Sequence, residues 1–466
     1  MSKTRLNSSK VFCLLSIAYI LGISGCKKLV QVGEPDDALT TATVFSNDSL
    51  AQAAVAGLYI NIMTSPKFFL NGGITLFPAL SADELVRTST VNSLEDQFAN
   101  NSILSSNQID NVYLWKAAYT YIYQCNICME GLEKATGVNA ALKKQLLGEV
   151  QFVRALCYHY LVNLYGDVPL VVGTNADVNA MLSRYTVANV YKQIVSDLTD
   201  AIEELGDDKA NTRPTKYAAQ ALLARVYLYT GQWSKATEKA STVITSGRFW
   251  LEGDLNNVFT AGSNEIIFQW VPVGDGMNSA EGFMFVPTAQ TPKPAYKLRQ
   301  GLLDVFEPGD LRYPNWVKSV TVSSTTYSYP NKFKLVNSPG PAKEYNVVLR
   351  LAEQYLIRAE AEAQLNQIDN AVNDLNMIRR RAKLPALATN ISADSCLRRI
   401  EQERRIELFA EWGHRWFDLK RTNRIDSVML ANTEKAPNWS KEDQLYPIPL
   451  SELQYAPNLT QNPGYE

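Results

Sequence analysis

The chain has 466 residues, of which 46% are hydrophobic and 20% are charged, an ordinary globular mixture rather than that of a disordered or fibrous protein. A net charge of -2 gives no basic excess for nucleic-acid binding, and the length suits two or three core-forming units. With only His159 and His414, a histidine-rich metal site is excluded, and six cysteines are too few for a disulfide scaffold. We therefore expect no cofactor and no metal ion; a calcium site built from oxygens of residues 248–345 stays an open alternative, although no Asp-rich loop supports it.

The N-terminus has the features of an export signal. A basic segment precedes an apolar run of twelve residues, 11–22, and this run is too short to span a membrane, which needs about 20 apolar residues. The following Ile-Ser-Gly-Cys, ending at Cys26, resembles a bacterial lipobox, in which the peptide is cut before a lipidated cysteine. The alternative is an ordinary signal peptide with a chance cysteine. We predict a lipoprotein signal peptide over 1–25, lipidation at Cys26, and a polar tether over 26–40.

Apolar residues recur at helical spacing through most of the following chain. This spacing predicts helices over 47–63, 108–134, 142–165 and 186–205. Gly166 stops the third of them. The fold class that follows is mainly α.

A repeat-like unit comes next. Residues 217–247 match the tetratricopeptide pattern, with small residues at the helix crossing and Gly231 in the turn. A second copy lies 135 residues later, counted from Ala224 to Ala359, and has Asn366 at the turn. Asn can replace Gly where a turn needs a left-handed conformation. Because the copies are separated in sequence, we expect a discontinuous helical scaffold with a large insertion rather than a simple solenoid.

The insertion, residues 248–345, is rich in Pro, Gly and Ser and carries strand-like runs at 265–271 and 317–329. Residues 65–101 have a similar character. Binding residues often lie on such loops above a rigid scaffold.

Several stretches of charged and aromatic residues carry a family resemblance. They include Glu149 to Leu170 (EVQFVRALCYHYLVNLYGDVPL) and Glu403 to Arg421 (ERRIELFAEWGHRWFDLKR), and the remaining ones are residues 349–363, 374–382, 446–449 and 459–465. In these stretches, and in their order along the chain, the sequence resembles the SusD/RagB family. Most of these charges, including those at 403–407, are interpreted as structural ion pairs or a solvated face.

The resemblance implies a tetratricopeptide-like helical superhelix on which a loop-rich, partly β insertion forms the ligand face. It divides the chain into an N-terminal SusD-like region (41–247), the insertion (248–345) and a C-terminal RagB/SusD region (346–466). It also implies an outward-facing lipoprotein of the outer membrane that captures a nutrient, most often a glycan. The expected partner is a TonB-dependent channel of the SusC/RagA type.

Common catalytic signatures are missing: the sequence has no G-x-S-x-G, HExxH, Walker A or GxGxxG motif. Cys125 and Cys128 have C-x-x-C spacing, but they lie in a predicted helix and fit small buried residues better. Asp83 and Glu84 are adjacent, so on a strand they would point to opposite faces rather than flank one glycosidic bond. We therefore predict a protein that is not an enzyme.

Two alternatives to nutrient capture stay open: a membrane-attached scaffold that binds only proteins, and a glycosidase whose acids come from distant segments. Sugars present flat C–H faces edged by hydroxyls, so a receptor needs exposed aromatic platforms and planar polar groups. The candidates on the irregular segments are the aromatic residues Phe68, Phe69, Trp270, Phe283, Tyr296 and Trp316 and the polar residues Arg87 and Asn100. The alternative for each aromatic residue is that it packs in the core.

Overall fold

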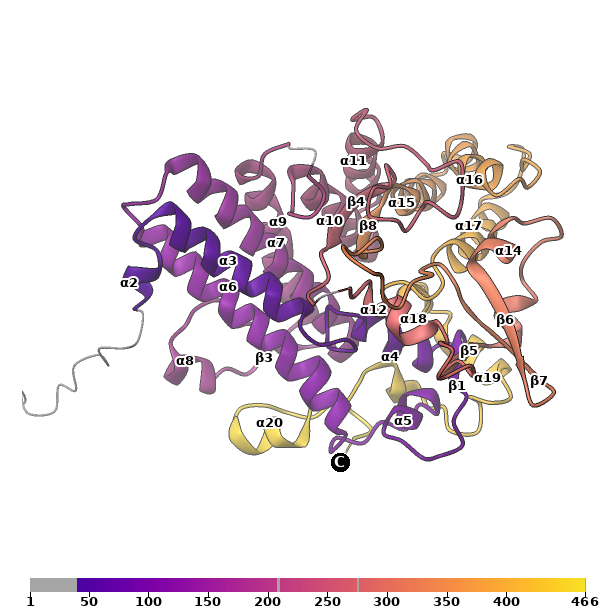
Figure 1. Ribbon diagram of the computed structural model, residues 1–466, viewed down its shortest axis with the longest axis horizontal. Coiled ribbons are helices and arrows are strands. Elements are labelled where there is room, and N and C mark those ends of the chain that lie inside the picture. Colours follow the sequence, from indigo (N-terminus) through magenta and orange to yellow (C-terminus); the bar gives the residue numbers. More distant parts are fainter. Residues whose placement is uncertain (1–39, 208–209, 275, 466) are drawn as a thin grey trace, which may run out of the picture.

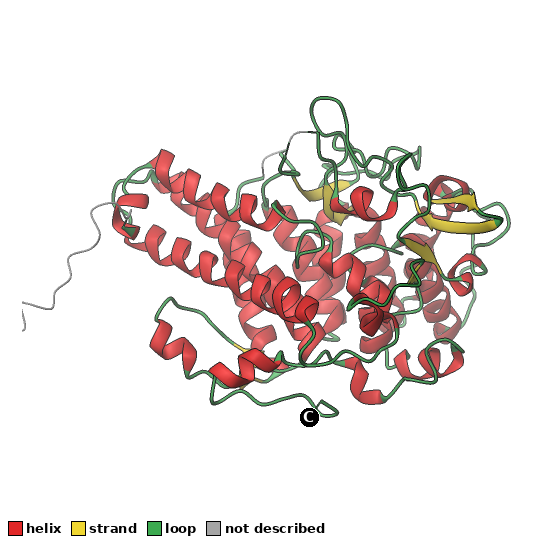
Figure 2. Ribbon diagram, turned by 60° about the horizontal axis from the view of Figure 1, so that its bottom comes forward, coloured by secondary structure: helices red, strands yellow, loops and turns green. Residues whose placement is uncertain are grey.

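The computed structural model describes residues 40–207, 210–274 and 276–465. Its body is mainly α-helical, as the sequence predicts, and most of the short strands lie at one side of the helices (Figures 1 and 2). The predicted boundaries at 247 and 345 stay predictions.

The helices vary from one turn to seven, and many begin at a side-chain cap. Those before the insertion are α2 (Thr41–Val44), α3 (Asp48–Met63), α4 (Gly73–Ser81), α5 (Glu95–Ala99), the π-helix η2 (Ile109–Lys116), α6 (Ala117–Lys134), α7 (Ala140–Tyr165), α8 (Ala176–Ala180), α9 (Val187–Glu204), α10 (Lys216–Tyr229) and α11 (Trp233–Ile244). Those that follow are α12 (Ala280–Phe285), α13 (Gln300–Leu303), α14 (Arg312–Trp316), α15 (Leu351–Gln364), α16 (Ile368–Arg381), α17 (Ala393–Glu407), α18 (His414–Arg421), α19 (Ile425–Ala431), the 3-10 helix η3 (Lys441–Gln444) and α20 (Leu450–Tyr455).

Local sequence explains where the long N-terminal helices begin and end. The side chains of Asn47, Asn139 and Thr186 each accept a hydrogen bond from a backbone N–H in the first turn of α3, α7 and α9. Gly166, with φ of 73°, ends α7. The four predicted helices are confirmed. The predicted helix over 108–134 differs only in that its first part, η2, is π-helical.

The two tetratricopeptide-like copies are helical hairpins, α10–α11 and α15–α16, that pack directly against each other through α11 and α15. Gly231 and Asn366, the predicted turn residues, have φ of 68° and 60°, the left-handed conformation that favours Gly and tolerates Asn. The superhelix is therefore continuous in space from α7 and α9 through α10, α11, α15 and α16 to α17. The chain leaves it after α11 and returns at α15.

The strands pair antiparallel, two by two. They are β1 (Leu85–Arg87), β2 (Val168–Pro169), β3 (Arg184–Tyr185), β4 (Ile266–Trp270), β5 (Tyr296–Leu298), β6 (Val317–Val322), β7 (Thr325–Pro330) and β8 (Asn346–Arg350). The pairs are β1–β5, β2–β3, β4–β8 and β6–β7. The run predicted at 265–271 is β4, and the run at 317–329 forms a hairpin that turns at Ser323 and Ser324 with positive φ. β4, inside the insertion, pairs with β8, which directly follows the insertion.

A buried charge network joins the insertion to the C-terminal helices. Glu407, at the end of α17, is fully buried and accepts hydrogen bonds from Arg350 at 2.6 Å, from Arg312 at 3.1 Å and from Arg381. Arg350 also bonds Glu265 at 3.0 Å. The charges of the 403–407 motif are thus structural, as predicted, and each is paired with a residue from another segment.

Candidate ligand-binding site

Four of the six predicted platform residues are buried, so the expected exposure is wrong at these positions. They are no more than 2% exposed: Phe69, Trp270, Tyr296 and Trp316. Trp270 packs between Tyr59 and Phe268, whose ring centroids lie 5.2 and 4.6 Å from that of Trp270. Phe69 meets the ring of Tyr160 edge-on.

Trp316 is buried because it borders the charge network. Its indole N–H donates to the carbonyl of Leu255 at 3.0 Å, and its ring centroid lies 4.8 Å from the ammonium of Lys332. Lys332 donates in turn to Glu411 at 2.5 Å. Stacking of a cation on an indole face stabilises the charge away from water. Trp316 therefore supports buried charges instead of presenting its face to a ligand.

Tyr296 and the predicted polar residue Arg87 do come together, since they are cross-strand partners in β5 and β1. The Tyr296 hydroxyl donates to Glu95 at 2.8 Å and accepts from Lys67 at 2.9 Å. Arg87 bonds Asp96 at 2.6 Å and lies 3.2 Å from Glu95. Burial raises the pKa of the Tyr296 hydroxyl, and the Glu95 charge adds to this. These groups fasten α5 to the β1–β5 pair and bond mainly to one another.

The three other candidates are accessible. Phe283, on α12, is 48% exposed, and Asn100 is exposed at the end of α5. Phe68 is half-buried and stacks on Tyr113 with ring centroids 4.5 Å apart. Their accessibility is compatible with the predicted ligand contact.

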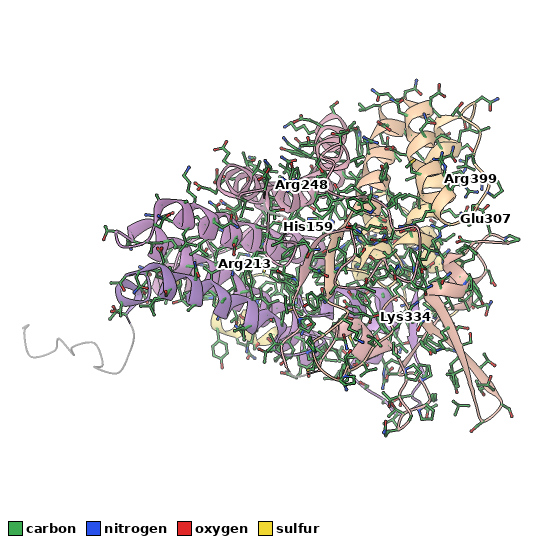
Figure 3. All side chains as sticks on the ribbon, turned by 45° about the horizontal axis from the view of Figure 1, so that its top comes forward. His159, Arg213, Arg248, Glu307, Lys334 and Arg399 are labelled. Atoms are coloured by element: carbon green, nitrogen blue, oxygen red, sulfur yellow. The ribbon has the colours of Figure 1, made fainter. Side chains whose placement is uncertain are left out.

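The structure has an aromatic-lined pocket that the sequence interpretation missed. This aromatic pocket, of about 370 Å³, is lined by Tyr217, Arg248, Phe249, Trp250 and Asn264, among others. Trp250 is 54% exposed, whereas every other tryptophan of the described chain is buried or half-buried. Figure 3 labels Arg248, whose guanidinium lies 5.8 Å from the Tyr217 ring centroid and donates to Asp207 at 3.0 Å.

The pocket wall is fixed by local contacts. The rings of Tyr217 and Phe249 meet edge-on at 6.0 Å, and the backbone N–H of Trp250 donates to the carbonyl of Asn264 at 3.2 Å. Gly247, with φ of 67°, turns the chain after α11. An exposed aromatic face beside planar Arg and Asn groups suits a sugar ring. In the sequence, the pair Phe249 and Trp250 at the start of the insertion is the feature that could have indicated this pocket.

The histidines, the C-x-x-C cysteines and Asp83 are held in environments that do not suit acid–base or nucleophilic catalysis. His159 and His414 are buried, and burial, with Arg225 adding to it, lowers both pKa values far below the ordinary range. Cys125 and Cys128 are buried thiols in α6, as predicted. Asp83 is bonded by Arg405 and Arg415 at 2.7 and 2.8 Å. In residues 40–207, 210–274 and 276–465 we find no cluster of metal-ligating side chains and no helix with the length and apolar character of a membrane span.

Comparison with known proteins covers both ends of the chain. Residues 46–228 match a family model described as starch-binding associating with outer membrane, and residues 310–465 match the SusD family model. SusD-like protein P2 of Formosa agariphila is 29% identical over 98% of this chain and 100% of its own length. A SusD superfamily crystal structure from Bacteroides vulgatus has a TM-score of 0.77 at 25% identity, covering 91% of this chain and all of that one. Surface glycan-binding protein A from Bacteroides thetaiotaomicron has the same fold, with a TM-score of 0.76 at 21% identity over 90% of this chain and all of its own.

Proposed function

Because this chain belongs to the SusD/RagB family, we propose that it binds a nutrient glycan at the cell surface and delivers it to a TonB-dependent outer-membrane channel. The match at both ends of the chain, one to a model described as starch-binding, carries this proposal. A similar solved structure that is named a surface glycan-binding protein supports it.

The aromatic pocket is the site that we propose for the glycan. The Trp250 ring is broad, exposed and set beside Arg248 and Asn264, so a pyranose could stack on it while its hydroxyls reach polar groups. Phe283 is similarly exposed, but it lies on α12, which contributes no residue to this pocket. The two exposed aromatics therefore allow a matched test.

The test begins with a screen of the purified protein against diverse polysaccharides, followed by calorimetry with the best ligand. We expect Trp250→Ala to lower affinity on the order of tenfold or more, the range found for stacking on an aromatic ring. Phe283→Ala should leave affinity unchanged, and both variants should melt with the parent protein. Loss of binding in Phe283→Ala alone would place the glycan on the other surface. Capture of proteins but of no polysaccharide would favour the scaffold alternative.

The protein is proposed to act by binding, without catalysis. Asp83 is neutralised by two arginines, and Glu84 beside it is buried. Incubation of the identified glycan with the protein should give no shortened products by chromatography. Products that vanish on substitution of a carboxylate would instead support the glycosidase alternative.

Membrane attachment is proposed through Cys26, which lies outside the described residues. Mass spectrometry of the mature N-terminus should find a chain that begins at a lipidated Cys26, and a chain that begins elsewhere without lipid would contradict this. Co-purification from solubilised outer membranes tests the partner. A large β-barrel protein should accompany the chain, and nutrient uptake that is intact after deletion would argue against delivery.

A further inference from the structure

A second cavity, whose lining differs in residue type from that of the aromatic pocket, lies among α15, α17 and α18. This arginine cavity, of about 340 Å³, is lined by six arginines: Arg398, Arg404, Arg405, Arg415, Arg421 and Arg424. It shares no residue with the aromatic pocket. Its volume is within the range of small-molecule sites.

The carboxylates around this cavity do not balance the arginines. Arg404 and Arg421 are neutralised by Glu360 and Asp418, in a closed set of ion pairs at 2.7 to 3.0 Å and one shorter contact. Asp83 serves both Arg405 and Arg415.

Glu401 is the fourth carboxylate that pairs with these arginines, and it forms ion pairs with Arg415 at 3.3 Å and with Arg424 at 2.8 Å. Six arginines thus share four carboxylate partners, Glu360, Asp418, Asp83 and Glu401, so the arginines outnumber their partners by two. An excess of this size around one cavity favours an anionic ligand.

Several buried polar atoms at the cavity lack a partner. Within the described ranges, Nη1 of Arg404, Nε of Arg405 and Oε1 of Glu84 make no hydrogen bond, although all three residues line the cavity. Burial raises the pKa of Glu84 to about 8, and the Asp83 charge adds to this, so its carboxyl is protonated and can donate. Buried polar groups in folded proteins are normally satisfied. The cavity wall therefore holds unsatisfied hydrogen-bonding groups just below its surface.

Apolar side chains also line the cavity, among them Trp233, Ile400, Leu408 and Leu419, beside the polar Gln364, Thr422 and Asn423. A second, more open cavity of about 780 Å³ shares Arg398, Glu401, Arg405, Arg415 and Arg424 with it. The two cavities are therefore adjacent, and Glu401 borders both of them. A sugar acid, with hydroxyls on every side, would leave the apolar wall unused.

We propose that the arginine cavity binds a small amphipathic carboxylate, whose charge meets the arginines while its apolar body packs on Ile400, Leu408 and Leu419. Arg398 and Arg424 border both cavities and are exposed, so their charges are available to a ligand. Glu401 competes with the ligand for Arg415 and Arg424.

The test uses the detergent-purified full chain and 3-phenylpropionate as the probe, with calorimetry or ligand-observed NMR as the readout. Its uncharged amide is the matched ligand control, and glucuronate represents a hydrophilic carboxylate. We expect 3-phenylpropionate to bind, and to bind more tightly than either control. Arg398→Ala and Arg424→Ala should each weaken binding on the order of tenfold, as for loss of a hydrogen bond to a charged group. Glu401→Gln should tighten it several-fold.

Arg399→Ala is the matched protein control, since Arg399 is exposed on the same helix, loses the same charge and does not line the cavity (Figure 3). It should bind as the parent does, and all variants should keep the parent melting temperature. Absence of binding, equal binding of the amide, or equal loss in Arg399→Ala and Arg398→Ala would each overturn the proposal. Tighter binding of glucuronate than of 3-phenylpropionate would refute the amphipathic assignment. None of these outcomes depends on a glycan, so the proposed function is tested separately.

Discussion

Replacing Glu407 by glutamine tests whether the buried charge network holds the insertion on the helical superhelix. The carboxylate serves Arg312, Arg350 and Arg381, which come from three different segments. In Glu407→Gln the amide oxygen could still accept from one guanidinium. The amide NH2 would then face another guanidinium, and the charges of three buried arginines would lose their shared partner.

The magnitude follows from the burial. Removing one partner of a buried ion pair typically costs about 3–5 kcal/mol of folding free energy, because the remaining charge is left without compensation. For a chain of this length, an unfolding entropy of about 2 cal/mol/K per residue converts that cost into a fall in melting temperature of roughly 3–6 °C. Burial by itself raises the pKa of Glu407, but Arg381, Arg350 and Arg312 outweigh it and hold the pKa far below its ordinary range.

The assay is urea denaturation of the parent, Glu407→Gln and Glu238→Gln, the last removing an exposed carboxylate from α11 as the control. The control should shift by no more than about 0.5 kcal/mol. A depressed folded-state pKa contributes stability above the unfolded-state value, near 4.5, that is lost as the pH falls. The deficit of Glu407→Gln should therefore shrink below about pH 4.5. Equal midpoints for the two variants at neutral pH would refute the reasoning.

Three further predictions concern the turns, the buried acids and the thiols. Asn366→Ala should destabilise the protein by about 1 kcal/mol in thermal denaturation and Asn366→Gly should not, because φ is 60° there; equal effects would contradict a left-handed turn. Burial raises the pKa of Asp110 to about 8, against an opposing hydrogen bond from Tyr165, so the folded state holds a proton that the unfolded state releases above about pH 4. The stability of Asp110→Asn relative to the parent should thus grow by on the order of 1 kcal/mol per pH unit between pH 4 and 8, and a pH-independent difference would sink this assignment. A thiol reagent should label Cys125, Cys128, Cys157 and Cys396 only after denaturation, since burial raises the pKa values of their thiols. Rapid labelling of the native protein would contradict this.

The helical framework could be predicted because its information is local. Apolar spacing, capping residues such as Thr186, and the turn residues Gly231 and Asn366 each act within a few positions of the chain. The motifs of the SusD/RagB family, which occur in order along the chain, predicted the same helical framework for the whole protein. Even the separation of the two repeat copies was visible, although their direct stacking through α11 and α15 was not.

The site was harder to predict because exposure depends on partners that are distant in sequence. Trp316 follows a Pro-containing segment typical of a loop, yet Lys332 and the carbonyl of Leu255 bury it. Trp250 looks no different in sequence, but nothing in the described chain covers its face fully. Similarly, the charges of 403–407 were recognisable in sequence as ion-pairing groups. The excess of arginines over carboxylates around one cavity is apparent only when α15, α17 and α18 are assembled.

The pairing of β4 with β8 brings the two ends of residues 271–345 together. Trp270 and Asn346 are cross-strand partners, so the chain departs and re-enters at points separated by about 5 Å. Closing a loop of twice the length across such a gap costs only about 0.6 kcal/mol more. Residues 271–345 can thus change in length at little cost in loop closure, provided that their ends meet and that Arg312 and Lys332 keep their partners in the buried charge network. Selection can then lengthen or shorten one surface of this protein while the helical frame and both proposed cavities, which take no residue from 271–345, are inherited unchanged.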